Sequence, residues 1–183
     1  MIIKATGDIS KLAKHFNLPL VGLEIGVCGG GMGCAFLEAG FDKVYSIDSW
    51  KHLNQTGDGG YSEEWHAINY NAAKQALAKY GDKSVIIRGK SEDVHDQIPD
   101  NSVSVIFIDA DHRYETVKKD IQNYYPKLIK GGIMSFHDYM NAGYGVTEAV
   151  QEFCKDRYEI FVTYDNPDGE AGNQGATSCY FIK

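Results

Sequence analysis

Short apolar runs alternate with longer segments of helical periodicity along most of the chain. The runs are rich in Val and Ile, which predicts strands, and the segments whose apolar residues recur every three or four positions predict helices. Strands are expected at 21–26, 43–49, 84–89, 102–109, 133–139, 159–165 and 178–183. Helices are expected at 32–40, 63–81, 91–98, 113–132 and 146–157, the third of these opening on the N-cap signal of Ser91.

This alternation is typical of an α/β protein and predicts a single doubly wound, seven-stranded, mostly parallel sheet. The loop NPDGEAGNQGAT joins the last two strands without a helical pattern, so the last strand is expected to be antiparallel. We interpret residues 1–183 as one domain, of which residues 1–20 form an N-terminal helical extension.

Composition narrows the function classes. The net charge is −7 and Lys and Arg are scattered, which argues against nucleic acid and favours a small-molecule partner. No apolar run is long enough to span a membrane, and the first residues lack a signal-peptide pattern, so we expect a cytoplasmic protein. The four cysteines form no CxxC pair and are expected to be reduced; the oligomeric state stays open.

Ligands of such sheets bind outside the carboxyl ends of the strands. This rule places Gly26, Asp48, Gly89, Asp109 and His137 along one rim of the sheet. The loop 51–62 follows the second strand at the same rim, where it is either a lid or an ordinary surface loop.

The glycine-rich stretch EIGVCGGGMG (24–33) follows the first predicted strand and opens a helix, as in a cofactor-binding turn. Its glycines do not have the GxGxxG spacing of a dinucleotide fingerprint, and the carboxylate of Glu24 suits a cationic ligand better than a pyrophosphate. Asp48 ends the second strand, where a carboxylate either takes both hydroxyls of a ribose or serves as a turn residue.

The sequence resembles the class I S-adenosylmethionine-dependent methyltransferases. The resemblance runs in order through LEIGVCGGGMG, VYSIDSW, IRGKSEDV, IFIDADHRYETVKKD and GGIMSFHDY. It is narrower with the small-molecule O-methyltransferase branch that includes catechol-type, macrolide-sugar and cephalosporin-pathway enzymes. One departure is Cys28, where many methyltransferases carry a further glycine.

The resemblance implies a cofactor site for S-adenosylmethionine. It implies that Asp48 holds the ribose hydroxyls, that Ser91 and Glu92 border the adenine, and that Asp109 lies near the sulfonium end. The residues implied around the methionine part are Glu24, Gly26, Gly29, Gly30 and Gly31.

Two neighbouring strand tips carry Asp109 and the pair His137–Asp138. Converging carboxylates suit Mg²⁺, whereas a histidine shifts the preference toward Mn²⁺, Fe²⁺ or Zn²⁺. The resemblance implies acidic metal ligands at Asp109 and Asp138, but His137 stands where an acidic residue is common. His137 is therefore either a third metal ligand or a general base, and His112 either a base or a polar residue at a helix start.

The function implied is methyl transfer from S-adenosylmethionine to a hydroxyl group of a small molecule, such as a sugar or a phenol, with or without a divalent metal. A nicotinamide-dependent oxidoreductase and a non-catalytic partner subunit that binds the cofactor are the alternatives. The remaining histidines are interpreted as surface or structural residues: His15, His52, His66 and His95.

Overall fold

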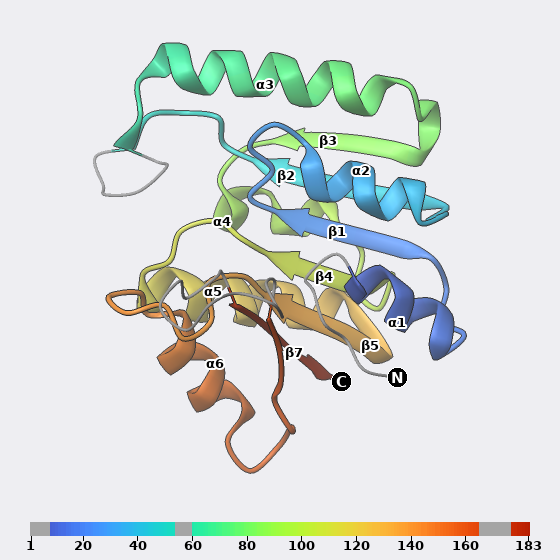
Figure 1. Ribbon diagram of the computed structural model, residues 1–183, viewed down its shortest axis with the longest axis vertical. Helices are drawn as coiled ribbons and strands as arrows, with labels where there is room; N and C mark the ends of the chain where they lie inside the picture. The colour runs from blue at the N-terminus through green and yellow to red at the C-terminus, as the bar shows by residue number, and fades with distance from the viewer. Residues whose placement is uncertain (1–7, 54–59, 165–176) are drawn as a thin grey trace.

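The computed structural model describes residues 8–53, 60–164 and 177–183 (Figure 1). The strands are β1 (Val21–Ile25), β2 (Lys43–Asp48), β3 (Ser84–Arg88), β4 (Val103–Ile108), β5 (Leu128–Phe136), β6 (Phe161–Tyr164) and β7 (Thr177–Ile182). The helices are α1 (Ile9–His15), α2 (Gly31–Glu38), α3 (Glu63–Ala78), α4 (Ser91–Val94), α5 (Tyr114–Tyr124) and α6 (Val146–Cys154). Short 3₁₀ turns are η3 (Gly81–Lys83), η4 (His95–Gln97) and η5 (Tyr125–Lys127).

The strands form one seven-stranded sheet in the order β3-β2-β1-β4-β5-β7-β6. The pairs β1–β2, β1–β4, β2–β3 and β4–β5 are parallel, whereas β7 runs antiparallel to both of its neighbours. The doubly wound, mostly parallel sheet expected from the sequence is therefore confirmed, including its antiparallel last strand.

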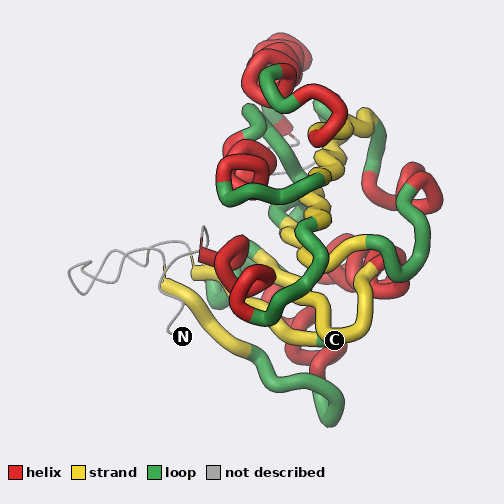
Figure 2. The backbone as a smooth tube through the Cα atoms, turned by 90° about the vertical axis from the view of Figure 1, so that its right-hand side faces the viewer, coloured by secondary structure: helices red, strands yellow, loops and turns green. Residues whose placement is uncertain are grey.

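Helices cover both faces of the sheet, as the edge-on view shows (Figure 2). On one face α1, α2 and α3 bury side chains such as Leu12, Phe36 and Leu77 in a common apolar core. On the other face α4, α5 and α6 do the same with Val94, Ile121 and other apolar residues. Because both faces are covered, every residue of the central strand β4 is buried, which explains its nearly continuous apolar sequence.

The boundary between α5 and β5 differs from the sequence prediction. A helix over 113–132 was expected, but α5 ends at Tyr124 and β5 already begins at Leu128. Pro126 explains the early end, because proline lacks the N–H that would continue the helix and clashes with the preceding turn. The next segment, LIKGGIMSF, becomes the long fifth strand, five residues earlier than the predicted start at 133.

The helices α5 and α6 lie against each other at one side of the sheet. An ion pair joins them, with 2.9 Å between Lys118 Nζ and Glu152 Oε1.

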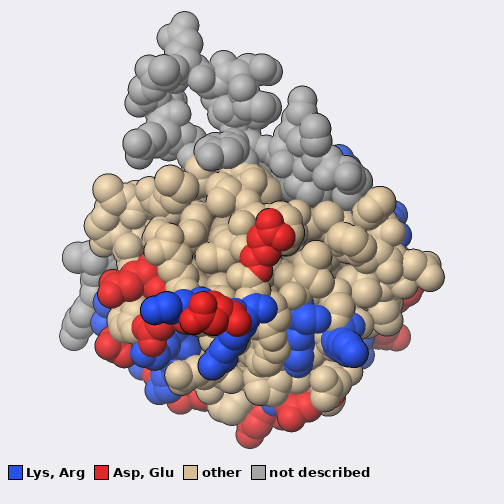
Figure 3. All heavy atoms as spheres, turned by 90° about the horizontal axis from the view of Figure 1, so that it is seen from below, with Lys and Arg blue, Asp and Glu red and all other residues tan. Residues whose placement is uncertain are grey.

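On the face seen from below, basic and acidic side chains are interspersed (Figure 3). Among the described helices, none combines the length and the apolar character that a membrane span requires.

Candidate functional site

A cleft of about 740 Å³ lies at the carboxyl ends of the parallel strands. This size is within the usual range for small-molecule and cofactor sites. All five residues that the sequence places on the rim of the sheet line it: Gly26, Asp48, Gly89, Asp109 and His137.

The turn after β1 approaches β4 so closely that only glycine fits at its first position. Gly26 has a φ of +89°, and a Cβ at this position would overlap the carbonyl oxygen of Asp109. Its N–H donates to the carbonyl oxygen of Ile47 at 2.9 Å, which fixes the turn between β2 and β4. The backbone around Gly26 therefore borders the cleft with no side chain in the way.

Asp48, at the end of β2, holds this turn in place. Its Oδ2 accepts the backbone N–H groups of Val27 at 2.9 Å and Cys28 at 3.0 Å, and its Oδ1 accepts that of Trp50 at 2.8 Å. A carboxylate offers about four acceptor positions. Three of these positions are used within the protein, and the role of Asp48 at the ribose hydroxyls stays a prediction.

The next three glycines lie outside the lining of the cleft. Gly30 is the N-cap of α2 with a φ of +93°, and Ala73 of α3 faces it. Gly29 lies near Asn69, and Gly31 begins α2. Gly29 and Gly30 thus face α3, and the role beside the cofactor that the resemblance implies for Gly29, Gly30 and Gly31 stays a prediction.

Glu24 lines the cleft from within β1 although only 2% of it is exposed. Ser46 Oγ donates to its Oε2 at 3.3 Å. Burial raises the pKa of Glu24 to about 8, against the opposing effect of the Ser46 hydrogen bond. A carboxyl group in this setting gains most from a cationic ligand group, which would compensate its buried charge.

Ser91 and Glu92 line the cleft beside Gly89. The N-cap of α4 is Lys90 rather than Ser91, so the predicted capping role of Ser91 is wrong. Its hydroxyl instead donates to Asp120 Oδ1 on α5 at 2.6 Å. The carboxylate of Glu92 pairs with Lys119, also on α5.

Asp109, His137 and Asp138 come together at the tips of β4 and β5. One potential ligand atom from each lies within 4.8 Å of the others, as a metal site requires. His137 Nδ1 is 3.2 Å from Asp138 Oδ2 and 3.5 Å from Asp109 Oδ1. The two strand tips predicted to be neighbours are therefore neighbours, with their carboxylates directed at one point.

His112 completes the cluster from the loop that precedes α5. Its Nε2 lies 3.1 Å from Asp138 Oδ2 and 3.4 Å from Asp109 Oδ1. Burial lowers the pKa of His112, but the hydrogen bonds to Asp109 and Asp138 outweigh this and raise it to about 9. Hydrogen bonds from His112 and His137 hold the pKa of Asp138 well below its usual range.

The chain after β5 is fixed against the start of α5. Asp138 has a φ of +54°, and its Oδ1 accepts from Asn141 Nδ2 at 3.1 Å. The Gly145 N–H donates to the His112 carbonyl at 2.8 Å. The ring of Tyr144 stacks on that of His112, with the centroids 4.4 Å apart and 8° between the planes. This loop therefore covers one side of the cluster.

Asp111 supports the same segment from the α5 side. Its Oδ1 accepts the backbone N–H of Arg113 at 2.9 Å, and the Arg113 guanidinium pairs with its carboxylate. These contacts fix the segment between β4 and α5, next to His112.

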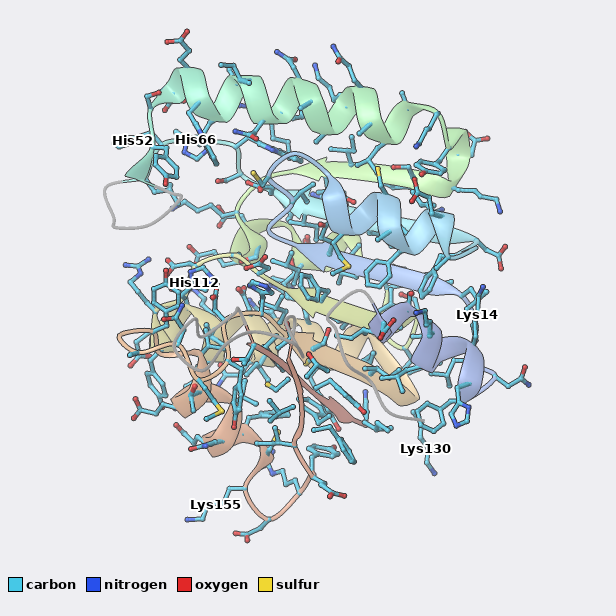
Figure 4. The ribbon with its side chains drawn as sticks, viewed as in Figure 1. Lys14, His52, His66, His112, Lys130 and Lys155 are labelled. Carbon is cyan, nitrogen blue, oxygen red and sulfur yellow. The ribbon has the colours of Figure 1, made fainter. Side chains whose placement is uncertain are left out.

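Two buried polar residues that line the cleft were not predicted as site residues. His66 was interpreted as a surface or structural residue, but it is 5% exposed and lines the cleft from the first turn of α3, beside Trp65. In Figure 4 it lies near His52, with His112 lower at the same end of the sheet. Asp120 is 1% exposed and lines the cleft from α5. Both sit inside amphipathic helices, where the sequence pattern alone does not separate a buried polar residue from a surface one.

The loop 51–62 and the loop 166–177 were singled out by their length. Residues 54–59 and 165–176 lie outside the described residues, so the interpretation of the first loop as a lid stays a prediction. At its two ends, His52 Nδ1 contacts the carbonyl oxygen of Tyr61 at 2.9 Å, and the ring of Tyr61 lies 4.6 Å from that of Trp65.

A doubly wound sheet with a glycine turn after β1, a carboxylate after β2 and a cleft at the strand tips defines an α/β protein of the nucleotide-cofactor-binding class. Residues 23–139 match the methyltransferase domain family. The match covers more than half of the chain, and the protein belongs to this family. The resemblance to methyltransferases found in the sequence is thereby confirmed.

Curated relatives are similar over parts of their length. The uncharacterized protein y4gI of Sinorhizobium fredii is 29% identical over 126 residues, which is 68% of this chain and 13% of that protein. The uncharacterized protein R132 of Acanthamoeba polyphaga mimivirus is 33% identical over 86 residues, 41% of this chain and 38% of that protein. This chain therefore matches well under half of the length of either relative.

Solved structures share the fold at low identity. The O-methyltransferase NovP matches with a TM-score of 0.65 and 20% identity, over 97% of this chain and 77% of that chain. An O-methyltransferase from Bacillus cereus in complex with S-adenosylhomocysteine matches with a TM-score of 0.67 and 16% identity, over 97% and 80%. Spermidine synthase from Thermotoga maritima matches with a TM-score of 0.61 and 14% identity, over 90% of this chain and 53% of that chain. Proteins of different activities thus share this fold.

Proposed function

We propose that this protein transfers the methyl group of S-adenosylmethionine to a hydroxyl group of a small molecule. The observation that carries the proposal is a single cleft with two chemically different parts of its lining. The glycine turn and Asp48 line one part, and Asp109, His112 and His137 line another. The first part suits a nucleoside cofactor and the second suits a reacting hydroxyl, so the cofactor and the acceptor can meet in a single cavity.

The residues of the first part fit S-adenosylmethionine better than a nicotinamide cofactor. The buried carboxyl of Glu24 favours a cation, and the methionine end of S-adenosylmethionine carries an ammonium and a sulfonium group. A pyrophosphate would bring negative charge toward the same carboxyl. We assign Gly26 and Glu24 to the methionine end, Asp48 to a ribose hydroxyl, and Ser91 and Glu92 to the adenine.

The second part fits a divalent cation. Asp109, His137 and Asp138 offer two carboxylates and one imidazole within 4.8 Å, a mixed oxygen and nitrogen set that favours Mn²⁺, Fe²⁺ or Zn²⁺ over Mg²⁺. A cation held there lowers the pKa of an acceptor hydroxyl bound beside it. His112 contacts both carboxylates, and we assign it the role of positioning them.

Methyl transfer from a sulfonium is an in-line displacement, so the acceptor oxygen must lie on the axis of the S–CH₃ bond. Holding the two reactants in this geometry supplies much of the rate. Asp109 is placed to connect the two halves of the site, because its backbone adjoins Gly26 and its carboxylate faces His137. Where no metal is bound, His137 is our candidate for the base that takes the hydroxyl proton.

The proposal is tested by calorimetric titration of the EDTA-treated protein with S-adenosylhomocysteine, with NAD⁺ as the comparison ligand. Saturable binding of S-adenosylhomocysteine, and none of NAD⁺ in the same concentration range, is the expected result. Binding of NAD⁺ alone would overturn the proposal in favour of an oxidoreductase. Methyl transfer is then followed by formation of S-adenosylhomocysteine in the presence of candidate sugars and phenols.

A further inference from the structure

Asp120 is a buried acid at the wall of the cleft that the proposed chemistry does not use. It lies on α5, 1% of it is exposed, and its Oδ1 accepts from Ser91 Oγ at 2.6 Å. Its other oxygen, Oδ2, is buried and has no hydrogen-bond partner among the described residues. Burial raises the pKa of Asp120 to about 7.

An acid in this position is unfavourable for folding, because a buried carboxylate with an unpaired oxygen loses hydration without full compensation. A second hydrogen bond from α5 also reaches Ser91: the Tyr124 hydroxyl donates to the Ser91 carbonyl at 2.8 Å. Both contacts fix Ser91, which indicates that the orientation of this residue matters to the cleft.

The bond to Asp120 determines what Ser91 offers to a ligand. A serine hydroxyl has one proton to donate and lone pairs that accept. Because the proton is directed at Asp120 Oδ1, only the acceptor side of Ser91 Oγ remains for a ligand. The neighbouring side chain, Glu92, is an acceptor as well, and part of its capacity is taken by Lys119. The side chains of Ser91 and Glu92 are thus acceptors toward a ligand, whereas Lys90 and Lys119, which also line the cleft, are donors.

We infer that Asp120 is a positioning residue that keeps Ser91 Oγ an acceptor and thereby selects a 6-aminopurine over a 6-oxopurine. The inference rests on the proposed function, which puts the base of the cofactor at Ser91. The 6-amino group of adenine donates to an acceptor. A 6-oxo group would direct its own lone pairs at Ser91 Oγ, and both acceptors would lose their hydration without gaining a bond.

The test compares the affinities for S-adenosylhomocysteine and its 6-oxo analogue, S-inosylhomocysteine, by calorimetry at pH 8. The proteins are the wild type, Asp120→Asn, Ser91→Ala and, as the matched control, Asp93→Asn at an exposed position of α4. The wild type and the control should prefer the adenine ligand by about tenfold or more. Asp120→Asn should reduce that ratio at least about fivefold, because its amide can donate to Ser91 and free the hydroxyl to donate to a 6-oxo group.

Ser91→Ala removes the hydroxyl acceptor itself and should also lower the ratio, which keeps the test valid if Asp120→Asn folds poorly. A merely structural role for Asp120 would weaken both ligands equally and leave the ratio unchanged, and that result would overturn the inference. Equal binding of the two ligands by the wild type would overturn it while leaving the proposed function intact. Failure of the wild type to bind either ligand would overturn both.

Discussion

Gly26 and Asp109 lie in direct backbone contact, so that a side chain at position 26 would overlap the carbonyl oxygen of Asp109. The contact joins the turn proposed to hold the cofactor to the strand tip proposed to hold the acceptor. It follows from the parallel pairing of β1 with β4, which brings the carboxyl ends of both strands to the same edge.

Gly26→Ala is expected to destabilise the protein by about 2 kcal/mol or more, because it combines a positive φ with a backbone overlap. It should also abolish measurable binding of S-adenosylhomocysteine, since the turn can relax only by moving into or away from the cleft. Gly31→Ala is the matched control, because no heavy atom lies within 4 Å of its added Cβ. Thermal unfolding and calorimetry measure the two effects, and equal behaviour of both variants would contradict the assignment of Gly26.

Glu24→Gln is expected to make the stability less dependent on pH. The pKa of Glu24 is about 8 in the folded protein and about 4.3 in an unfolded chain. Between these values the folded protein binds the proton and the unfolded chain does not, so the stability contributed by Glu24 falls as the pH rises from about 4.3 through 8. Glutamine has no charge to bury and lacks this loss.

The wild type should therefore lose stability relative to Glu24→Gln between pH 5 and pH 8, by an amount on the order of 3 kcal/mol. Thermal unfolding of both proteins at the two pH values measures the difference. Glu64→Gln, at an exposed position of α3, is the control and should follow the wild type. If the thermal unfolding midpoints of the wild type and of Glu24→Gln change equally between pH 5 and pH 8, Glu24 is ionised at pH 8 without a cost in stability, which contradicts the prediction.

Asp138→Asn is expected to lower the affinity for Mn²⁺ by at least about tenfold. Asparagine keeps the size of the side chain and tolerates the positive φ of this position, so the fold should be preserved. The affinity of the EDTA-treated proteins is measured by titration with Mn²⁺, with Asp93→Asn as the control. Unchanged affinity in Asp138→Asn, or no saturable Mn²⁺ binding by the wild type, would remove the metal from the proposal.

Tyr124→Phe is expected to cost about 1 kcal/mol of stability, because it leaves the partly buried Ser91 carbonyl without this donor. Loosening of Ser91 should also weaken the binding of S-adenosylhomocysteine several-fold. Denaturant unfolding and calorimetry report the two effects. If stability falls and affinity does not, Tyr124 supports the fold without holding Ser91 for the ligand.

The sheet could be predicted because its signals are local. The strand β4 is apolar except for Ser104 and is followed directly by Asp109, and the rule for parallel sheets then places Asp109 at the ligand edge. The start of β5 could not be found in the same way. The residues from Leu128 onward continue the apolar pattern of α5, so the sequence pattern predicted that the helix extends through them. In the structure Pro126 ends the helical segment, and the strand begins at Leu128.

Parts of the site depend on contacts between distant segments and were missed for that reason. Asp120 is 29 residues from its partner Ser91, and nothing in the sequence near either residue indicates the bond. Asp48 was identified correctly as a residue of the cleft, but its three bonds to backbone N–H groups arise from the folded turn. The assignment of Gly29, Gly30 and Gly31 to the cofactor stays a prediction, because composition cannot distinguish a glycine needed for packing from one that faces a ligand.

The central claim is that the cleft at the strand tips holds the cofactor, and a crystal structure with S-adenosylhomocysteine tests it most directly. We expect density for the ligand between Gly26, Asp48 and Ser91, with the adenine at Ser91 and the sulfur toward Asp109. Density for the ligand at another surface, or in the cleft with its base at the Asp109 end, would contradict the account.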